Sequence, residues 1–281
     1  MEASGVSGAG TLDHVSDPVD GVVAEFLRQM REAASPERAV AMAAYMKNVA
    51  PFLGVGAGER RRIQRAVFPR GGAGLARRSG PAAQAAREQR RAHALQLGDA
   101  LWALRWRECR YAAIDILSSV ATTLDPATLD DVVMRWVSDM SWWDTVDELA
   151  AHVVGPILAR HREARDPRVA QWSVSADMWR QRTAVLFQLR YGADTDWPLL
   201  AEVIDTTSAG PYGDEFFIRK AIGWALRTYS AIDPVAVIAF VDDRPHLSGL
   251  SRREALRRID PELVALTRAR RTPVAGGRDP R

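Results

Sequence analysis

The sequence has few of the residues that build a disulfide framework, a zinc site or a membrane span. Its 281 residues include a single cysteine, Cys109, which excludes intramolecular disulfides and any multi-cysteine metal site. No apolar run approaches the ~20 residues that a transmembrane helix needs. The N-terminal residues include acids and lack an apolar stretch, so they do not resemble a signal peptide. We therefore expect a soluble protein of the cytoplasm.

Several familiar catalytic motifs are also missing. The five histidines show no metal-binding spacing, and the chain contains neither HExxH nor CxxC. The serines and histidines do not form a nucleophile elbow. Cys109 lies in the segment RECRYAA, where a free cysteine is most often a small core hydrophobe. The sequence gives no support to metal, thiol or serine-hydrolase chemistry, and it implies no cofactor.

Arginine is abundant and unevenly distributed. Residues 60–110 hold 13 arginines against three acids, and residues 251–281 hold nine against four. The first 36 residues hold six acids and two arginines. Such asymmetry favours a polyanion partner, and nucleic acid is the first candidate. Solvated charged faces in an arginine-rich chain would give the same count, so charge alone leaves both interpretations open.

The pattern of apolar residues predicts an all-α protein. Apolar residues recur at spacings of three and four in residues 108–124, 142–161, 177–191, 214–229 and 234–241. Ser35-Pro36 is a helix start signal, and Asp-Pro repeats that signal at residues 125, 233 and 260. No segment alternates as a strand does.

Asp-Pro or Gly-Asp punctuation recurs roughly every 35–45 residues, a period that resembles that of helical-pair repeats such as HEAT. Since one pair cannot bury its apolar face alone, we expect the pairs to stack into a curved solenoid with a concave side. One domain is predicted over residues 17–270, with disordered segments at 1–16 and 271–281. Residues 69–94 hold six arginines among Gly, Pro and Ala. They are predicted to be an Arg-rich loop insertion in which residues 82–93 could form a weakly packed helix.

One short segment combines aromatic and acidic residues in an unusual way. It reads Ser-Trp-Trp-Asp-Thr-Val-Asp over residues 141–147. On a helix, Trp143 and Asp147 stand at i and i+4 and therefore share a face. Two core tryptophans with a capping or ion-paired aspartate would give the same letters, so this segment alone does not establish a site.

Three further segments make the pattern specific. They are YMKN followed by PFLGV (residues 45–55), RTAVLFQL (182–189) and EFFIRKAIGWALR (215–227). Together with the Trp-Trp-Asp segment they resemble the signatures of the DNA alkylation repair enzyme family, the AlkD-type 3-methyladenine DNA glycosylases. Weaker matches at residues 101–117 and 250–255 extend the resemblance over about residues 20–260.

The resemblance implies a HEAT-like solenoid whose concave, basic face cradles duplex DNA. It implies that Asp147 is the catalytic carboxylate, that Trp143 contacts the damaged nucleotide, and that Arg182 contacts a phosphate beside that acid. Trp224 would form a second aromatic wall, and Tyr45 would line the same face. Core packing remains an alternative for Trp224, as does a structural ion pair for Arg182. Further phosphate contacts are expected among Lys47, Arg190, Arg219, Lys220 and Arg227.

The implied activity is hydrolysis of the N-glycosidic bond of cationic alkylated purines, such as N3-methyladenine and N7-methylguanine, in duplex DNA. One carboxylate would stabilise the oxocarbenium-like sugar, without base flipping, a cofactor or lyase activity. The expected partner is double-stranded DNA with alkylated bases. The protein is expected to be a monomer that does not bind membranes and is associated with the nucleoid when acting. Two alternatives remain: a self-resistance glycosylase for bulky alkyl adducts, and a non-catalytic helical-repeat DNA-binding or scaffold protein.

Overall fold

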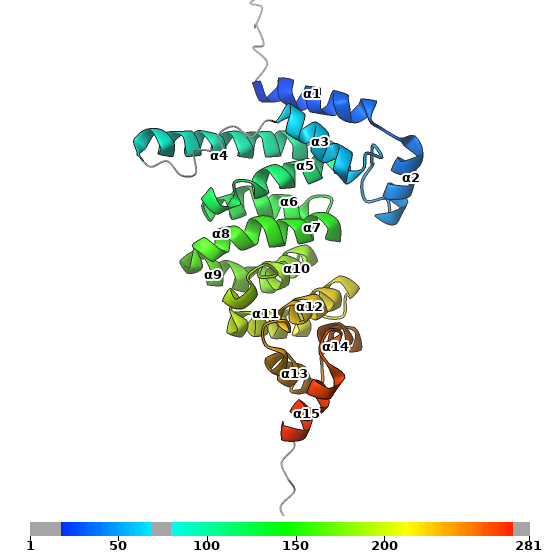
Figure 1. Cartoon of the computed structure of the whole chain (residues 1–281), viewed down its shortest axis with the longest axis vertical. Coiled ribbons are helices and arrows are strands. Elements are labelled where there is room, and N and C mark those ends of the chain that lie inside the picture. The colour runs from blue at the N-terminus through cyan, green and yellow to red at the C-terminus, as the bar shows by residue number, and fades with distance from the viewer. Residues whose placement is uncertain (1–17, 69–79, 272–281) are drawn as a thin grey trace, which may run out of the picture.

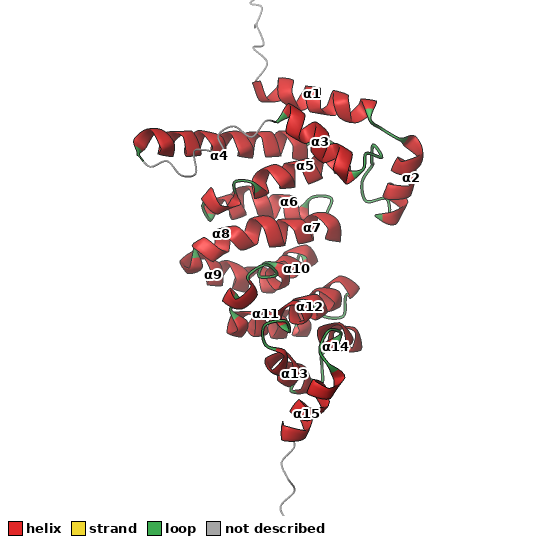
Figure 2. Ribbon diagram, viewed as in Figure 1, coloured by secondary structure: helices red, strands yellow, loops and turns green. Residues whose placement is uncertain are grey.

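A computed structural model describes residues 18–68 and 80–271, and in these two ranges the regular secondary structure is entirely helical (Figures 1 and 2). The all-α prediction is confirmed. The α-helices are α1 (Pro18–Glu32), α2 (Pro36–Tyr45), α3 (Ala57–Val67), α4 (Pro81–Trp102), α5 (Arg107–Ser118), α6 (Met134–Ser138), α7 (Trp143–Leu149), α8 (Gly155–Arg160), α9 (Arg162–Ser173), α10 (Met178–Leu186), α11 (Trp197–Ala209), α12 (Phe216–Tyr229), α13 (Pro234–Asp242), α14 (Gly249–Leu256) and α15 (Pro261–Arg271). No helix in these ranges is both long and apolar enough to cross a membrane.

The predicted start signals are present as helix caps. The Ser35 hydroxyl accepts a hydrogen bond from the backbone N–H of Arg38 at the start of α2. The Asp233 carboxylate accepts one from Ala236 at 2.8 Å at the start of α13. Each cap satisfies a backbone donor that has no partner inside the helix. Local sequence therefore fixes where these helices begin.

The helices stack in one column, with α1 near one end and α15 at the other (Figure 1). Five successive contacts join α3, α5, α7, α10, α12 and α14 into one layer, which we call the inner layer. The outer helices pack behind it, α4 against α5, α9 against α10 and α11 against α12. Buried apolar residues form one continuous core cluster from Val19 to Ile259. The molecule is thus a two-layer helical-repeat structure.

Side-chain contacts between neighbouring helical pairs reveal the period of the repeat. Trp102 Nε1 donates to Asp139 across 37 residues of sequence, and Arg244 pairs with Asp205 across 39. Lys220 pairs with Glu254 across 34. Each of these side chains therefore contacts a residue about one helical pair further along the chain. The separations of 34–39 residues are close to the 35–45 residues expected from the sequence.

The helix that carries the Trp-Trp-Asp segment crosses the column from one edge to the other. The backbone is helical without interruption over 18 residues, as α7, a π-helical turn at Ala150–Val154, and α8. At 1.5 Å per residue this rod is about 27 Å long. We call the edge at its start, Trp143, the near edge, and the edge at its end, Arg160, the far edge.

The structure differs in part from the prediction of an Arg-rich loop insertion over residues 69–94. Residues 81–94 are the first part of the 22-residue helix α4, which includes the helix considered over residues 82–93. Alanine, glutamine and arginine all favour helix, and the second half of α4 buries Leu97 and Leu101 in the core. Residues 69–79, the N-terminal segment 1–17 and the tail 272–281 lie outside the described residues. The predicted boundary at residue 270 falls one residue before the end of α15.

Candidate active site

Two buried carboxylates lie on the first two turns of α7, and each is held by an arginine from a different neighbouring helix. Asp144 and Asp147 are both 8% exposed. Asp144 pairs with Arg107 of α5, and Asp147 pairs with Arg182 of α10. The helix is therefore clamped from both sides along the inner layer. Since charged side chains are seldom buried without a partner, these two pairs fix where α7 lies.

Each of the three guanidinium nitrogens of Arg182 donates a hydrogen bond. Its Nε donates to Asp147 Oδ1 and its Nη2 to Asp147 Oδ2, both at 2.7 Å. Its third nitrogen, Nη1, donates to the backbone carbonyl of Phe217 on α12. Arg182 is 3% exposed. The two-point contact holds the carboxylate in one orientation, and it makes the structural ion pair that the sequence left open. A phosphate contact by Arg182 stays a prediction.

Burial raises the pKa of Asp147 above the value of an exposed aspartate. The hydrogen bonds and charge of Arg182 oppose that effect, whereas the negative charges of Asp144 and Glu148 add to it. The carboxylate is thus partly desolvated and yet held against a fixed cation. A perturbed carboxyl group of this kind is typical of functional sites.

A second hydrogen-bond network fixes the first turn of α7. Arg107, 1% exposed, donates to Asp144 at 2.9 and 2.5 Å, to the Met140 carbonyl at 2.8 Å and to the Thr145 hydroxyl at 3.0 Å. The Tyr111 hydroxyl donates to the same carboxylate at 2.5 Å. Burial and the charge of Asp144 raise the pKa of Tyr111, so its hydroxyl remains a donor. The network determines where Asp144, and with it the start of α7, is placed.

Sequence analysis did not identify Arg107 or Tyr111. One signal was available: Arg107 lies seven residues before Ile114 on α5, and Ile114 is in the core. A charged residue two helical turns from a core residue faces the interior and needs a buried partner. The sequence pattern does not say which acid that partner is.

The aromatic edge of the site joins α7 to α2. The ring of Tyr45 meets the ring of Trp143 edge-on, with their centroids 6.3 Å apart. Tyr45 is 70% exposed, and no residue of α2 is buried. Lys47, two residues further, is exposed and has a φ of 56°. The structure thus brings three predicted residues, Tyr45, Lys47 and Trp143, to the near edge.

The segment that follows α2 is anchored to the body by a buried carboxylate, Glu108. It accepts hydrogen bonds from the backbone N–H groups of Leu53, Gly54 and Val55 at 2.8–3.1 Å. Gly54 has a φ of +80°, and a Cβ there would lie 2.1 Å from the Ser35 carbonyl oxygen. Only glycine fits this turn. The anchor holds the end of α2 near Trp143.

A second aromatic group surrounds Arg182. The rings of Trp142, Trp179 and Phe217 lie 4.9–5.8 Å apart, and Phe217 also lies 5.9 Å from the Arg182 guanidinium. Phe216, 53% exposed, meets Phe217 edge-on. The indole nitrogen of Trp142 is buried and has no hydrogen-bond partner among the described residues. This group links the starts of α7, α10 and α12.

The predicted residues of α12 are less directly connected to Asp147. Trp224 is half-buried and lies two helical turns after Phe217 on the same face. Lys220 and Arg227 both pair with Glu254 of α14, Lys220 at 2.8 Å. The carbonyl of Arg219 accepts a hydrogen bond from Ser251. Their phosphate contacts stay predictions.

The structure places Arg190 away from the other predicted residues. It follows the end of α10 and lines a cavity with Arg162, Tyr191 and Asp194. These residues belong to the far edge, which the Trp143–Arg160 rod separates from Trp143. Within the described residues, Arg190 makes no hydrogen bond or ion pair with Asp147 or with Arg182, and its phosphate contact stays a prediction.

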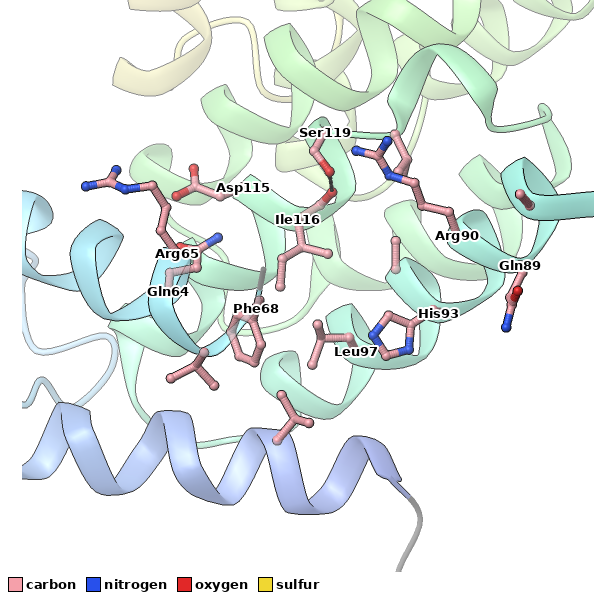
Figure 3. Close-up of a pocket in the computed structure, with 15 residues that line it drawn as sticks. Gln64, Arg65, Phe68, Gln89, Arg90, His93, Leu97, Asp115, Ile116 and Ser119 are labelled. Carbon is pink, nitrogen blue, oxygen red and sulfur yellow. Dashed lines mark hydrogen bonds between the residues drawn. The ribbon is translucent and has the colours of Figure 1, made fainter. Parts of the chain in front are cut away.

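A further cavity of about 520 Å³ lies between α1, α3, α4 and α5 (Figure 3). Phe68, His93, Leu97 and Ile116 are among its lining residues, and it shares none with the site at Asp147. Within residues 18–68 and 80–271, no group of three His, Cys, Asp or Glu side chains could hold a metal ion.

Comparisons with known proteins agree with this geometry. The model of the DNA alkylation repair enzyme family matches residues 26–259. The fold is similar to a solved structure described as a predicted DNA alkylation repair enzyme from Enterococcus faecalis. The two chains are 27% identical, the match covers 81% of this chain and 97% of the other, and the TM-score is 0.64. No curated protein matches the sequence. The chain belongs to the DNA alkylation repair enzyme family.

Proposed function

We propose that this protein is a monofunctional DNA glycosylase that removes cationic alkylated purines, such as N3-methyladenine and N7-methylguanine, from duplex DNA. The observation that carries the proposal is Asp147, a desolvated carboxylate oriented by two hydrogen bonds from Arg182. Trp143 lies one helical turn before Asp147 on α7, and the ring of Tyr45 from α2 meets the Trp143 ring edge-on. Membership of the repair family supports DNA as the partner.

A single carboxylate is enough for this reaction. The alkylated purine carries a positive charge and leaves without a general acid, whereas ordinary glycoside hydrolysis uses two carboxylates. As the N-glycosidic bond breaks, the sugar becomes cationic at C1′. The negative charge of Asp147 stabilises that cation and orients or deprotonates the attacking water. Arg182 keeps the carboxylate in place while this charge develops.

The aromatic side chains add selectivity for cationic bases. A cation beside an aromatic face gains about 0.5–2 kcal/mol, depending on how far it is desolvated. Trp143 and Tyr45 supply such faces at the near edge, and Trp224 supplies a further one on α12. A normal base carries no charge and gains nothing from this term. Lys47 is exposed two residues after Tyr45, and we propose that it contacts a phosphate of the bound DNA strand.

A bulky alkyl adduct is a second candidate substrate. Tyr45 is 70% exposed and belongs to a helix without buried residues, so the near edge is open on this side. An adduct that projects from a groove would meet little obstruction there. A self-resistance enzyme for such an adduct would use the same carboxylate and the same arginine.

Release of free base from methylated duplex DNA tests the proposal. The protein is incubated with methylated and unmethylated duplexes, and released N3-methyladenine and N7-methylguanine are measured by chromatography. We expect both bases only from methylated DNA, together with abasic sites and no strand cleavage. A duplex containing hypoxanthine, a neutral lesion, is the matched control and should react much more slowly. Equal rates for hypoxanthine and N7-methylguanine would contradict the proposed role of charge.

A further inference from the structure

Five arginines from four parts of the chain gather at the far edge. Arg87 and Arg91 of α4 line a shallow cleft together with Arg160 and His161 at the end of α8. Arg162 and Arg190 line the neighbouring cavity described above. Because residues 160–162 are consecutive, the two hollows are adjacent. We call the set Arg87, Arg91, Arg160, Arg162 and Arg190 the far-edge cluster.

Most of this charge is not used to hold the fold together. Arg160, Arg162 and Arg190 are exposed, and none of them has an ion-pair partner within 4 Å among the described residues. Arg91 pairs with Asp125 at 3.1 Å, with both side chains partly exposed. Such a pair contributes little to stability. Two acids line the hollows, Asp125 and Asp194, while Glu163 pairs with His161 and Asp196 interacts with Arg162 beside them. The arginines outnumber them.

Two parts of the far-edge cluster, the arginines at the end of α8 and those of α4, lie far from Asp147 along the helices that carry them. Thirteen residues of continuous helix separate Asp147 from Arg160, which corresponds to about 20 Å. Helix α4 has the same orientation: its last residue, Trp102, bonds Asp139 near the start of α7, whereas Arg87 lies 15 residues earlier, about 22 Å away. Figure 1 shows the free end of α4 and the α8–α9 turn on one side, and α2 on the other.

The composition of the far edge fits a polyanion better than a protein. Protein interfaces depend on aromatic and large apolar anchors. Within the described residues, the exposed large apolar side chains lie elsewhere, as with Val40, Tyr45, Phe216 and Leu266. Guanidinium groups bind phosphate oxygens in pairs of hydrogen bonds, and phosphate neutralisation alone supplies sequence-independent affinity.

We propose that the far-edge cluster is a second binding surface for the phosphate backbone of duplex DNA, separate from the surface around Asp147. The protein then has DNA-binding surfaces on two opposite edges. It can hold two duplex segments at once, and it can pass between them without dissociating fully. The inference rests on the placement of the arginines and, for bridging, on the DNA binding at the Asp147 surface that the proposed function includes; it requires no catalysis at Asp147.

A bridging experiment with undamaged DNA tests this surface independently of base release. Two duplexes carry a donor and an acceptor fluorophore, and energy transfer between them is measured as full-length protein is added at low salt. The variant is Arg160→Gln/Arg162→Gln/Arg190→Gln. The control is Arg258→Gln/Arg270→Gln/Arg271→Gln, which removes the same charge from exposed arginines at the α15 end of the column, of which Arg271 pairs with Asp243. Circular dichroism checks that both variants are folded.

We expect bridging by the wild type and the control, and its loss in the far-edge variant. We also expect the slope of log affinity against log salt for that variant to become shallower by about 2–3. Release of methylated bases at saturating DNA should be unchanged. Bridging that persists in the variant, or a wild type that never bridges, overturns the proposal and favours an acidic protein as partner. If the far-edge variant binds a single duplex no better than background, the proposal of two separate surfaces is also overturned. The surface around Asp147 would then be unable to bind DNA without the far edge.

Discussion

Removing Arg182 should destabilise the protein strongly, and the loss should depend on pH. Asp147 has both carboxylate oxygens bonded to this guanidinium at 2.7 Å, and neither residue is more than 8% exposed. In an Arg182→Met variant the methionine fills much of the space, but the carboxylate remains buried without its cation. Breaking a buried ion pair in this way costs about 3–5 kcal/mol. The Phe217 carbonyl also loses its donor.

The pH dependence follows from the pKa of Asp147. Burial already raises that pKa, and the loss of Arg182 raises it further because the cation favoured the ionised form. A carboxyl whose pKa is higher in the folded than in the unfolded state makes the folded state bind more protons. Stability of the variant therefore recovers as pH falls through the raised pKa. The loss relative to wild type should be larger at pH 8 than at pH 5.

Urea unfolding at pH 8 and pH 5 measures the effect. The control is Arg180→Met on the same helix, since Arg180 is partly exposed and approaches Asp177 only to 3.9 Å. It should cost less than about 1 kcal/mol. The double variant Asp147→Asn/Arg182→Met leaves no buried charge at these two positions and should recover about 1–3 kcal/mol of the single-variant loss. Equal losses at both pH values, with no recovery in the double variant, would refute the reasoning.

Two further substitutions test separate parts of the account. In Glu148→Gln, an exposed charge that raises the pKa of Asp147 is lost, so the acid limb of base release against pH should move to lower pH. The shift should be less than about half a unit because solvent screens the charge; a shift to higher pH would contradict the assignment of Asp147. In Gly223→Ala, the new Cβ would lie 2.5 Å from the Cβ of Glu254 and 3.1 Å from the Ser251 carbonyl oxygen, so urea unfolding should reveal a loss of about 1–3 kcal/mol. Gly58→Ala on α3, with nothing within 4 Å, should be neutral or stabilising, and equal effects at the two glycines would contradict the close approach of α12 and α14.

Helix starts and the repeat period could be predicted from sequence because both depend on local chemistry. A capping side chain such as Ser35 or Asp233 bonds a backbone group two or three residues ahead. The extent of α4 could not be predicted in the same way. Its first half follows Gly and Pro, and its second half is held by long-range burial of Leu97 and Leu101. Composition near residue 81 gives no information about that packing.

In the candidate site too, contacts set by local spacing could be predicted, and contacts between residues far apart in the sequence could not. Trp143 and Asp147 share a face of one helix, so their proximity follows from spacing. Their partners come from elsewhere: Arg182 lies 35 residues after Asp147, and Arg107 lies 37 residues before Asp144. Arg190 illustrates the converse case, in which sequence proximity does not give proximity in the structure. It follows Arg182 by eight residues, but α10 ends at Leu186 and the chain carries Arg190 to the far edge.

The central claim is that Asp147 is the catalytic carboxylate of an alkylpurine DNA glycosylase. Release of N7-methylguanine and N3-methyladenine from methylated duplex DNA, compared between the wild type and Asp147→Asn, tests it most directly. Glu148→Gln serves as the neighbouring control, and DNA binding is measured on each protein. We predict that release falls by about 100-fold or more in Asp147→Asn, while binding and fold are retained. A folded, DNA-binding Asp147→Asn variant that releases both bases at the wild-type rate would contradict the account.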